Sequence, residues 1–208
     1  MCMSVSIEDF KVKINEVSGN LYLSHFHLKI HEKMTEQKNL RLNEEEYPPF
    51  FEWSRMANYE AGILRLTKAY DDDNESLGLL KVINTIQSNY RFWCNSNPDL
   101  PRTLDVKELE QDRSFVTTNQ LVKGLNTLRN KVISHTDNRL HPKELNFVLD
   151  DVYSAFYSGQ NQILGKDVPS FNQYYELTTK GVEICNRYKK KIGMPPIELG
   201  ELGLEEIE

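Results

Sequence analysis

Apolar residues recur at helical spacing along most of this 208-residue chain. They return every three or four positions, the period that places side chains on one face of a helix. Strand-like alternation is rare, so the pattern predicts an all-α fold, an up-and-down helical bundle of five to six main helices. We expect main helices at about 6–37, 49–70, 77–93, 118–132, 142–163 and 170–188, with a short helix at about 106–113.

The helix expected at 118–132 carries the clearest apolar stripe, formed by Leu121, Leu125, Leu128 and Val132. The spacing of four, three and four residues keeps these side chains on one face. Thr117 or Thr118 precedes the stripe and is expected to cap the first turn of this helix.

The helix expected at 49–70 is rich in apolar residues and is expected to be largely buried. Turn formers at 71–74 separate it from the helix at 77–93, so the two are expected to form a helical hairpin. Aromatic residues in these two helices are interpreted as core or dimer contacts rather than as base-stacking groups. They are Phe50, Phe51, Trp53, Phe92 and Trp93.

The chain has 25 basic and 31 acidic residues, which gives a formal net charge of −6. A net anionic surface repels nucleic acid, so any RNA contact must come from a local basic site. The sequence has no apolar run of membrane-spanning length and no basic leader with an apolar core, so we expect a soluble, cytoplasmic protein. The length fits one domain, placed at residues 1–195, with an acidic C-terminal tail at 196–208.

No metal and no cofactor are expected. His27 and His31 lie four residues apart on the first expected helix, but no third ligand stands in a suitable motif. The run 71–73 fits a turn and helix cap better than a cation loop. The three cysteines are too far apart for a zinc site or a disulfide framework, and Lys189–Lys191 fits a solvated helix end.

Polar residues interrupt the apolar stripe near the end of the helix expected at 118–132. Between Arg129 and His135 the chain gathers a guanidinium, the Asn130 carboxamide, the Ser134 hydroxyl and an imidazole. Such groups together can bind a phosphate and move a proton without a metal ion. The segment therefore indicates metal-independent chemistry on a phosphodiester.

A single regular helix holds Arg129 and His135 apart. Six residues at about 100° each place them about 120° apart around the helix and about 9 Å apart along its axis. A second copy related by a twofold axis would bring its own arginine and histidine and concentrate these groups. We therefore predict a homodimer with a composite cleft.

The run from Arg129 to His135 resembles the signature of the HEPN superfamily of helical-bundle proteins. That signature is an arginine, a polar residue, four further residues and a histidine. Upstream, residues 63–67, Tyr70–Asp71, Ser76–Leu77 and Leu80 are similar to the corresponding part of the AbiU-type abortive-infection branch. Together with the helix order, the resemblance covers roughly residues 6–190.

The resemblance implies a metal-independent endoribonuclease that acts as a homodimer on RNA, often as a toxin or in antiphage defence. Carried over by position, Arg129 would stabilise the transition state and His135 would act as general acid or base at the 2′-hydroxyl. Asn130 would orient the substrate or a partner. Cleavage would leave a 2′,3′-cyclic phosphate and a 5′-hydroxyl. The motif fixes neither Ser134 nor Asp137, and we expect both to support the site by hydrogen bonds.

Asp137 also marks a departure from the family pattern. HEPN toxins regulated by nucleotidyltransferase partners have a tyrosine two residues after the histidine, where this chain has Asp137. Control by tyrosine modification at that position is therefore not expected. The sequence does not identify an antitoxin or another defence-system partner.

Two other interpretations of the same segment stay open. In the first, the chain is a noncatalytic HEPN-like helical module that binds a protein or a nucleotide-bearing partner through the same polar cleft. In the second, the bundle is purely structural and Arg129 pairs with a carboxylate from another helix. RNA cleavage would exclude the first, and a buried Arg129–carboxylate pair far from any cleft would favour the second.

Overall fold

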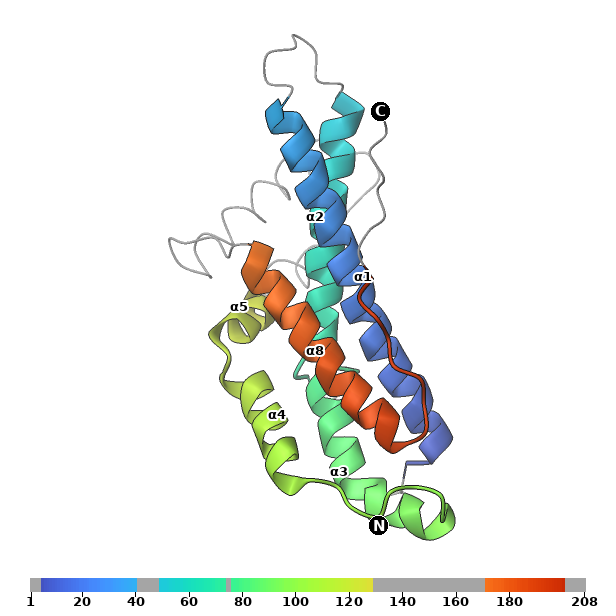
Figure 1. Ribbon diagram of the computed structural model, residues 1–208. Coiled ribbons are helices and arrows are strands. Elements are labelled where there is room, and N and C mark those ends of the chain that lie inside the picture. The colour runs from blue at the N-terminus through green and yellow to red at the C-terminus, as the bar shows by residue number, and fades with distance from the viewer. Residues whose placement is uncertain (1–4, 41–48, 74–75, 129–170, 201–208) are drawn as a thin grey trace, which may run out of the picture.

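The computed structural model describes residues 5–40, 49–73, 76–128 and 171–200, and Figure 1 shows their arrangement. This part of the chain contains six helices and no strand, which confirms the all-α class and the helical bundle. The helices are α1 (Ile7–Leu40), α2 (Pro49–Ala69), α3 (Leu79–Ser96), α4 (Val106–Thr118), α5 (Gln120–Leu128) and α8 (Phe171–Lys191).

Helix α1 is the long element on which the bundle is built. It begins after Ser6, whose hydroxyl accepts a hydrogen bond from the backbone N–H of Asp9 at 3.0 Å. One face of α1 is fully buried and packs against α2 and α8. That face is formed by Phe10, Ile14, Val17, Leu21 and Leu28. The helix expected at 6–37 is therefore confirmed, three residues longer at its end.

The α1–α2 pair is tightest where α2 carries a glycine. A Cβ at Gly62 would lie 2.8 Å from Cγ of Leu28, so a larger residue there would push the two helices apart. The Ser24 hydroxyl donates a 2.8 Å hydrogen bond to the carbonyl oxygen of Gly62 across the same contact. The close approach aligns α2 along α1 and sets which face of α2 is covered.

The expected hairpin between the helices at 49–70 and 77–93 is wrong. Helix α2 folds back on α1, and α3 continues beyond the end of α2 to pack on α1 and α4 (Figure 1). The reason is length. Helix α1 has 34 residues, while α2 has 21 and α3 has 18, so both of the shorter helices find room along α1.

The turn between α2 and α3 depends on Gly78. A Cβ at this position would lie 1.9 Å from the carbonyl oxygen of Asp71. On the other side of the turn, the Asp71 carboxylate accepts a hydrogen bond from the N–H of Asp73 at 3.0 Å. The Asp71–Asp73 run thus forms a turn, as expected from the sequence, but the expected helix cap there is wrong, because Gly78 is the N-cap of α3.

Gly78→Ala is expected to destabilise the protein by about 2 kcal/mol, because backbone must move to admit the methyl group. For a chain of this length, that corresponds to a fall of about 4–8 °C in the melting temperature, measured by circular dichroism. Gly19→Ala is the matched control, since a Cβ at Gly19 meets nothing within 4 Å. It should stabilise α1 by about 0.5–1 kcal/mol. Equal melting temperatures for the two variants would contradict this account of the turn.

Burial of the large apolar residues was only partly predicted. Ile63, Leu66 and Trp93 are buried as expected, but Phe50 is 81% exposed and Trp53 is 58% exposed. Phe92 on α3 is also exposed. The expectation of burial for Phe50 and Trp53 is therefore wrong, because α2 is apolar on two faces and only one of them meets α1.

The last described residues return along α8. The Asn186 side chain and the backbone of Ile197 exchange two hydrogen bonds, of 2.7 and 2.8 Å. Ile197 thus lies beside α8. Among the described helices, none combines enough length with enough apolar character to cross a membrane.

Candidate functional site

Helix α5 is the element that leads into the Arg129–His135 segment. The side chain of Asn119 caps it, accepting hydrogen bonds from the N–H groups of Leu121 at 2.9 Å and Val122 at 3.2 Å. The expected cap at Thr117 or Thr118 is wrong, because α4 continues to Thr118. Their hydroxyls instead donate to carbonyl oxygens one turn earlier in α4.

The apolar stripe anchors α5 in the bundle. Val122 and Leu125 are buried, and Leu121 is partly buried against the core. Through this face α5 packs on α4 and α2. Its last residue, Leu128, directly precedes Arg129, so a fixed helix delivers the chain to the start of the motif.

The residues predicted to carry chemistry lie outside the described residues. They are Arg129, Asn130, Ser134, His135 and Asp137. The same holds for Val132 and for the helix expected at 142–163. Their roles and their convergence in a cleft stay predictions.

A groove of about 860 Å³ lies between the α4–α5 junction and the first half of α8. Its apolar lining comes from Phe115, Leu121, Tyr175 and Leu177. Its polar lining is rich in carboxamides and hydroxyls, with three charged groups. These residues are Asn119, Gln120, Asn172, Gln173, Thr179, Glu176, Lys180 and Glu183.

The charges of this groove restrict what it can hold. The Lys180 ammonium is paired with the Glu183 carboxylate at 3.1 Å, and Glu176 adds a second carboxylate. A phosphate would be repelled there, whereas carboxamides can bond to neutral amide or base edges. The sequence did not predict this groove, because its two carboxamide pairs, 119–120 and 172–173, are far apart along the chain.

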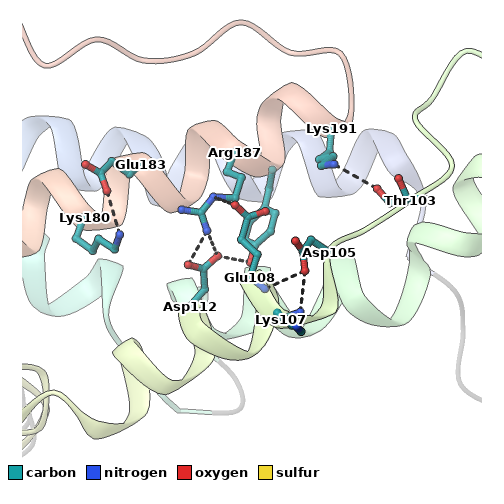
Figure 2. A network of polar contacts seen from close by, with 10 residues as sticks. Thr103, Asp105, Lys107, Glu108, Asp112, Lys180, Glu183, Arg187 and Lys191 are labelled. Atoms are coloured by element: carbon teal, nitrogen blue, oxygen red, sulfur yellow. Dashed lines mark hydrogen bonds and ion pairs between the residues drawn. The ribbon is translucent and has the colours of Figure 1, made fainter.

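A charged clasp fixes α8 to α4 next to the groove (Figure 2). The Arg187 guanidinium donates to both carboxylate oxygens of Asp112 at 2.8 Å, and the Tyr188 hydroxyl donates to the same carboxylate at 2.6 Å. Glu108 adds an ion pair with Arg187 at 3.0 Å. Asp112 is buried, so these donors replace the water that the carboxylate loses.

The HEPN family model described as AbiU2 matches residues 7–194 of the chain. The chain belongs to this HEPN family. The match includes every described helix and the Arg129–His135 segment. Among curated proteins and solved structures, none matches.

The upstream segment that resembles AbiU-type proteins has a structural role in this HEPN chain. Tyr70 is fully buried and its hydroxyl donates a 2.8 Å hydrogen bond to the carbonyl oxygen of Leu177 on α8. Burial raises the pKa of Tyr70 well above its ordinary value, so the phenol stays protonated and keeps donating. The distinctive tyrosine thus joins the end of α2 to α8.

Histidine side chains of the HEPN bundle bind protein groups. His27 contacts the Asn58 carboxamide oxygen at 2.9 Å, and His31 contacts the Arg55 carbonyl oxygen at 2.8 Å. His25 contacts the Thr178 hydroxyl at 3.1 Å. In the part of the chain that the structure describes, no group of three His, Cys, Asp or Glu side chains is arranged to hold a metal ion.

The described thiol in the core is poorly suited to nucleophilic chemistry. Burial raises the pKa of the Cys185 thiol to about 12, so almost none of it is thiolate at neutral pH. Cys185 lies on the buried face of α8 and is not among the residues that line the groove.

His25 gives the fold a pH dependence of known sign. Burial lowers its pKa, Lys29 lowers it further, and Glu32 acts in the opposite direction. The folded protein therefore takes up this proton less readily than the unfolded chain, whose histidine pKa is about 6.5. Stability is lost as the pH falls below that value. His25→Asn should reduce the loss between pH 7 and pH 5, measured by urea unfolding, and an unchanged loss would contradict this assignment.

Proposed function

We propose that this HEPN protein is a metal-independent endoribonuclease of toxin or antiphage type, with Arg129 and His135 acting in the cleft of a homodimer. The observation that carries the proposal is the family match over residues 7–194, which includes the motif. Arg129 stabilises the charge that develops on the phosphate, and His135 transfers the proton of the 2′-hydroxyl. Asn130 orients the RNA, and Ser134 and Asp137 support the histidine by hydrogen bonds.

The homodimer follows from the helical spacing of the two residues. About 120° around one helix separates Arg129 from His135, so two copies assemble the pair better than one. The anchored α5 supports the proposed catalytic roles, because a rigid scaffold keeps catalytic groups in position. An antitoxin or another defence partner that controls the cleft is part of the same proposal.

The direct test is cleavage of RNA by the purified full chain in excess EDTA. The proposal predicts fragments that end in a 2′,3′-cyclic phosphate and begin with a 5′-hydroxyl. The ends are identified by mass spectrometry before and after treatment with a 2′,3′-cyclic phosphodiesterase, which opens the ring and adds the mass of one water. Intact RNA at all enzyme concentrations, or fragments with 5′-phosphates, would contradict it.

The groove beside α8 favours a second candidate function, a noncatalytic binding module. Its carboxamide-rich lining and its carboxylates suit a neutral or basic peptide segment better than a polyanion. This candidate predicts a stable complex with a protein partner in the absence of any RNA cleavage. Pull-down with wild type and with a Gln173→Trp variant that fills the groove would separate it from the ribonuclease.

A further inference from the structure

Helix α2 carries a second apolar stripe on the side that faces away from the core. The stripe is formed by Phe50, Trp53, Ala57, Ala61 and Leu64. At 100° per residue these five positions fall within an arc of about 80°. Tyr59, Ile63 and Leu66, which are buried against the bundle, lie on the nearly opposite side of the helix. We call these five residues the outer stripe.

The outer stripe is exposed in the folded chain. Phe50 and Trp53 are mostly exposed, Ala57 is exposed, and Ala61 and Leu64 are partly exposed. No described helix other than α1 and α5 makes substantial contact with α2. The end of α2 that bears the two aromatic residues projects beyond α8 (Figure 1). Two large aromatic residues aligned on one exposed helix face are typical of an interaction surface.

The order of large and small residues in the outer stripe is self-complementary. The spacings are three, four, four and three, which read the same in both directions. When two α2 helices pair antiparallel about Ala57, Phe50 lies opposite Leu64 of the second copy and Trp53 lies opposite its Ala61. The two Ala57 residues then meet on the twofold axis. Each position of the stripe therefore finds a position of the same stripe, as a twofold interface requires.

Parallel pairing fits the same residues poorly. It would place Phe50 against Phe50 and Trp53 against Trp53, with alanine facing alanine farther along. The bulky end would hold the helices apart and leave space around the small residues. Antiparallel pairing sets large side chains against small ones and allows close packing of the two helices. No charged residue lies within the arc of the stripe between Phe50 and Leu64.

The area of the outer stripe is adequate for the centre of a stable interface. An aromatic side chain buries about 150–250 Å² when it is fully covered. Covering the exposed parts of Phe50 and Trp53 in both copies removes on the order of 600 Å² from water. Stable interfaces bury about 1,200–2,000 Å² in total, so these residues and their neighbours along the 21-residue helix provide its apolar core.

We propose that the outer stripe of α2 is the surface through which two copies of this chain associate, antiparallel and centred on Ala57. This inference deepens the proposed function, on which it rests only for the expectation of a homodimer. It assigns the dimer contact to α2, so the partner copy binds on the face of the bundle opposite α1. Phe50 and Trp53 are the anchors of the contact.

The test is the mass of the full chain in solution, measured by size-exclusion chromatography with light scattering over a concentration series. Wild type should have the mass of a dimer, and Trp53→Asp and Ala57→Arg should halve it. Phe92→Asp is the matched control, because Phe92 is similarly exposed but lies on α3. It should remain dimeric. Helical circular dichroism spectra like that of wild type and a cooperative unfolding transition show that the variants are folded. Their melting temperatures should be lower than that of wild type, because the folded state loses the stabilisation that association provides. A monomeric wild type, or dimeric Trp53→Asp and Ala57→Arg, would overturn the proposal.

Cross-linking tests whether the two Ala57 residues meet at the centre of the contact. With Cys2 and Cys94 replaced by serine, Ala57→Cys should give a disulfide-linked dimer under mild oxidation. Ser88→Cys, exposed on α3, should remain a monomer on the same non-reducing gel. Equal cross-linking of both variants would overturn the contact at Ala57.

RNA cleavage measured on the same samples separates the two proposals. If wild type cleaves RNA as a dimer and Trp53→Asp keeps its mass, the α2 interface is wrong and the ribonuclease stands. If wild type is an inactive dimer and Trp53→Asp has half its mass, the α2 interface stands and the proposed ribonuclease activity is wrong.

Discussion

Replacing His135 by alanine is expected to lower the rate of RNA cleavage by about 10²–10⁴-fold, because the 2′-hydroxyl loses its proton acceptor. Arg129→Ala should lower it by about 10²–10³-fold through loss of charge stabilisation at the phosphate. The rates are measured with a fluorescent RNA in excess EDTA. Both variants should keep the melting temperature of wild type, which separates a chemical defect from an unfolded protein.

Arg139→Ala is the control for this pair of variants. It removes a guanidinium close to the motif in sequence but outside the Arg129–His135 signature. A simple loss of positive charge should weaken RNA binding alike in Arg129→Ala and Arg139→Ala, because phosphate attraction depends on charge. The proposed roles require a loss of turnover for Arg129→Ala alone. Undiminished cleavage by His135→Ala would remove His135 from the mechanism.

Asp112→Ala is expected to have the largest effect on stability, about 3 kcal/mol, or about 6–12 °C in melting temperature. The variant leaves the Arg187 guanidinium without its bidentate partner and the buried Tyr188 hydroxyl without an acceptor. Arg187 is partly exposed, so water compensates part of the loss and keeps the effect at the lower end for a buried pair. Chemical and thermal unfolding both measure the effect.

Glu108→Ala is the matched control for the clasp. Glu108 contacts the same Arg187 from the same helix, but its side chain is 38% exposed. Exposed ion pairs contribute about 0–1 kcal/mol, so this variant should be close to wild type. In the double variant Asp112→Ala/Arg187→Ala, the loss should be smaller than the sum of the two single losses. Equal, small effects of Asp112→Ala and Glu108→Ala would show that the clasp does not fix α8 to α4.

The helices of this fold were readable from the sequence because each one buries a continuous stripe. Periodicity gave α1 and α2 to within a few residues, and it found the buried positions of α3 from Leu79 to Trp93. It failed where a helix is apolar on two faces. The positions Phe50 and Trp53 have the same spacing as core residues, and only the path of α1 decides which face of α2 is covered.

The packing order was less predictable than the helices. A turn at 71–78 allows α3 either to fold back on α2 or to continue beyond its end. Helix α3 continues beyond α2, because α1 is long enough to contact both helices. The clasp between Asp112 and Arg187 joins residues 75 positions apart, which no local pattern reveals. The predicted cap of α5 was one or two residues too early, because Thr117, Thr118 and Asn119 are all suitable cap residues.

The candidate site was predictable only as a motif. Arg129 and His135 form a signature that the sequence displays and that the family match supports. The groove at the α4–α5 junction is built by residues from two distant segments, so it becomes visible only in three dimensions. The outer stripe was visible as apolar residues, but its exposure, and hence its role, depends on the fold.

The most direct test of the composite cleft is a mixture of two inactive variants. Arg129→Ala and His135→Ala are unfolded together, refolded in equal amounts, and assayed for RNA cleavage beside wild type. If each site takes its arginine from one copy and its histidine from the other, mixed dimers contain one intact site, and the mixture should regain about a quarter of wild-type activity. A refolded mixture as inactive as its components, beside an active wild type that refolds to a dimer, would contradict the composite cleft.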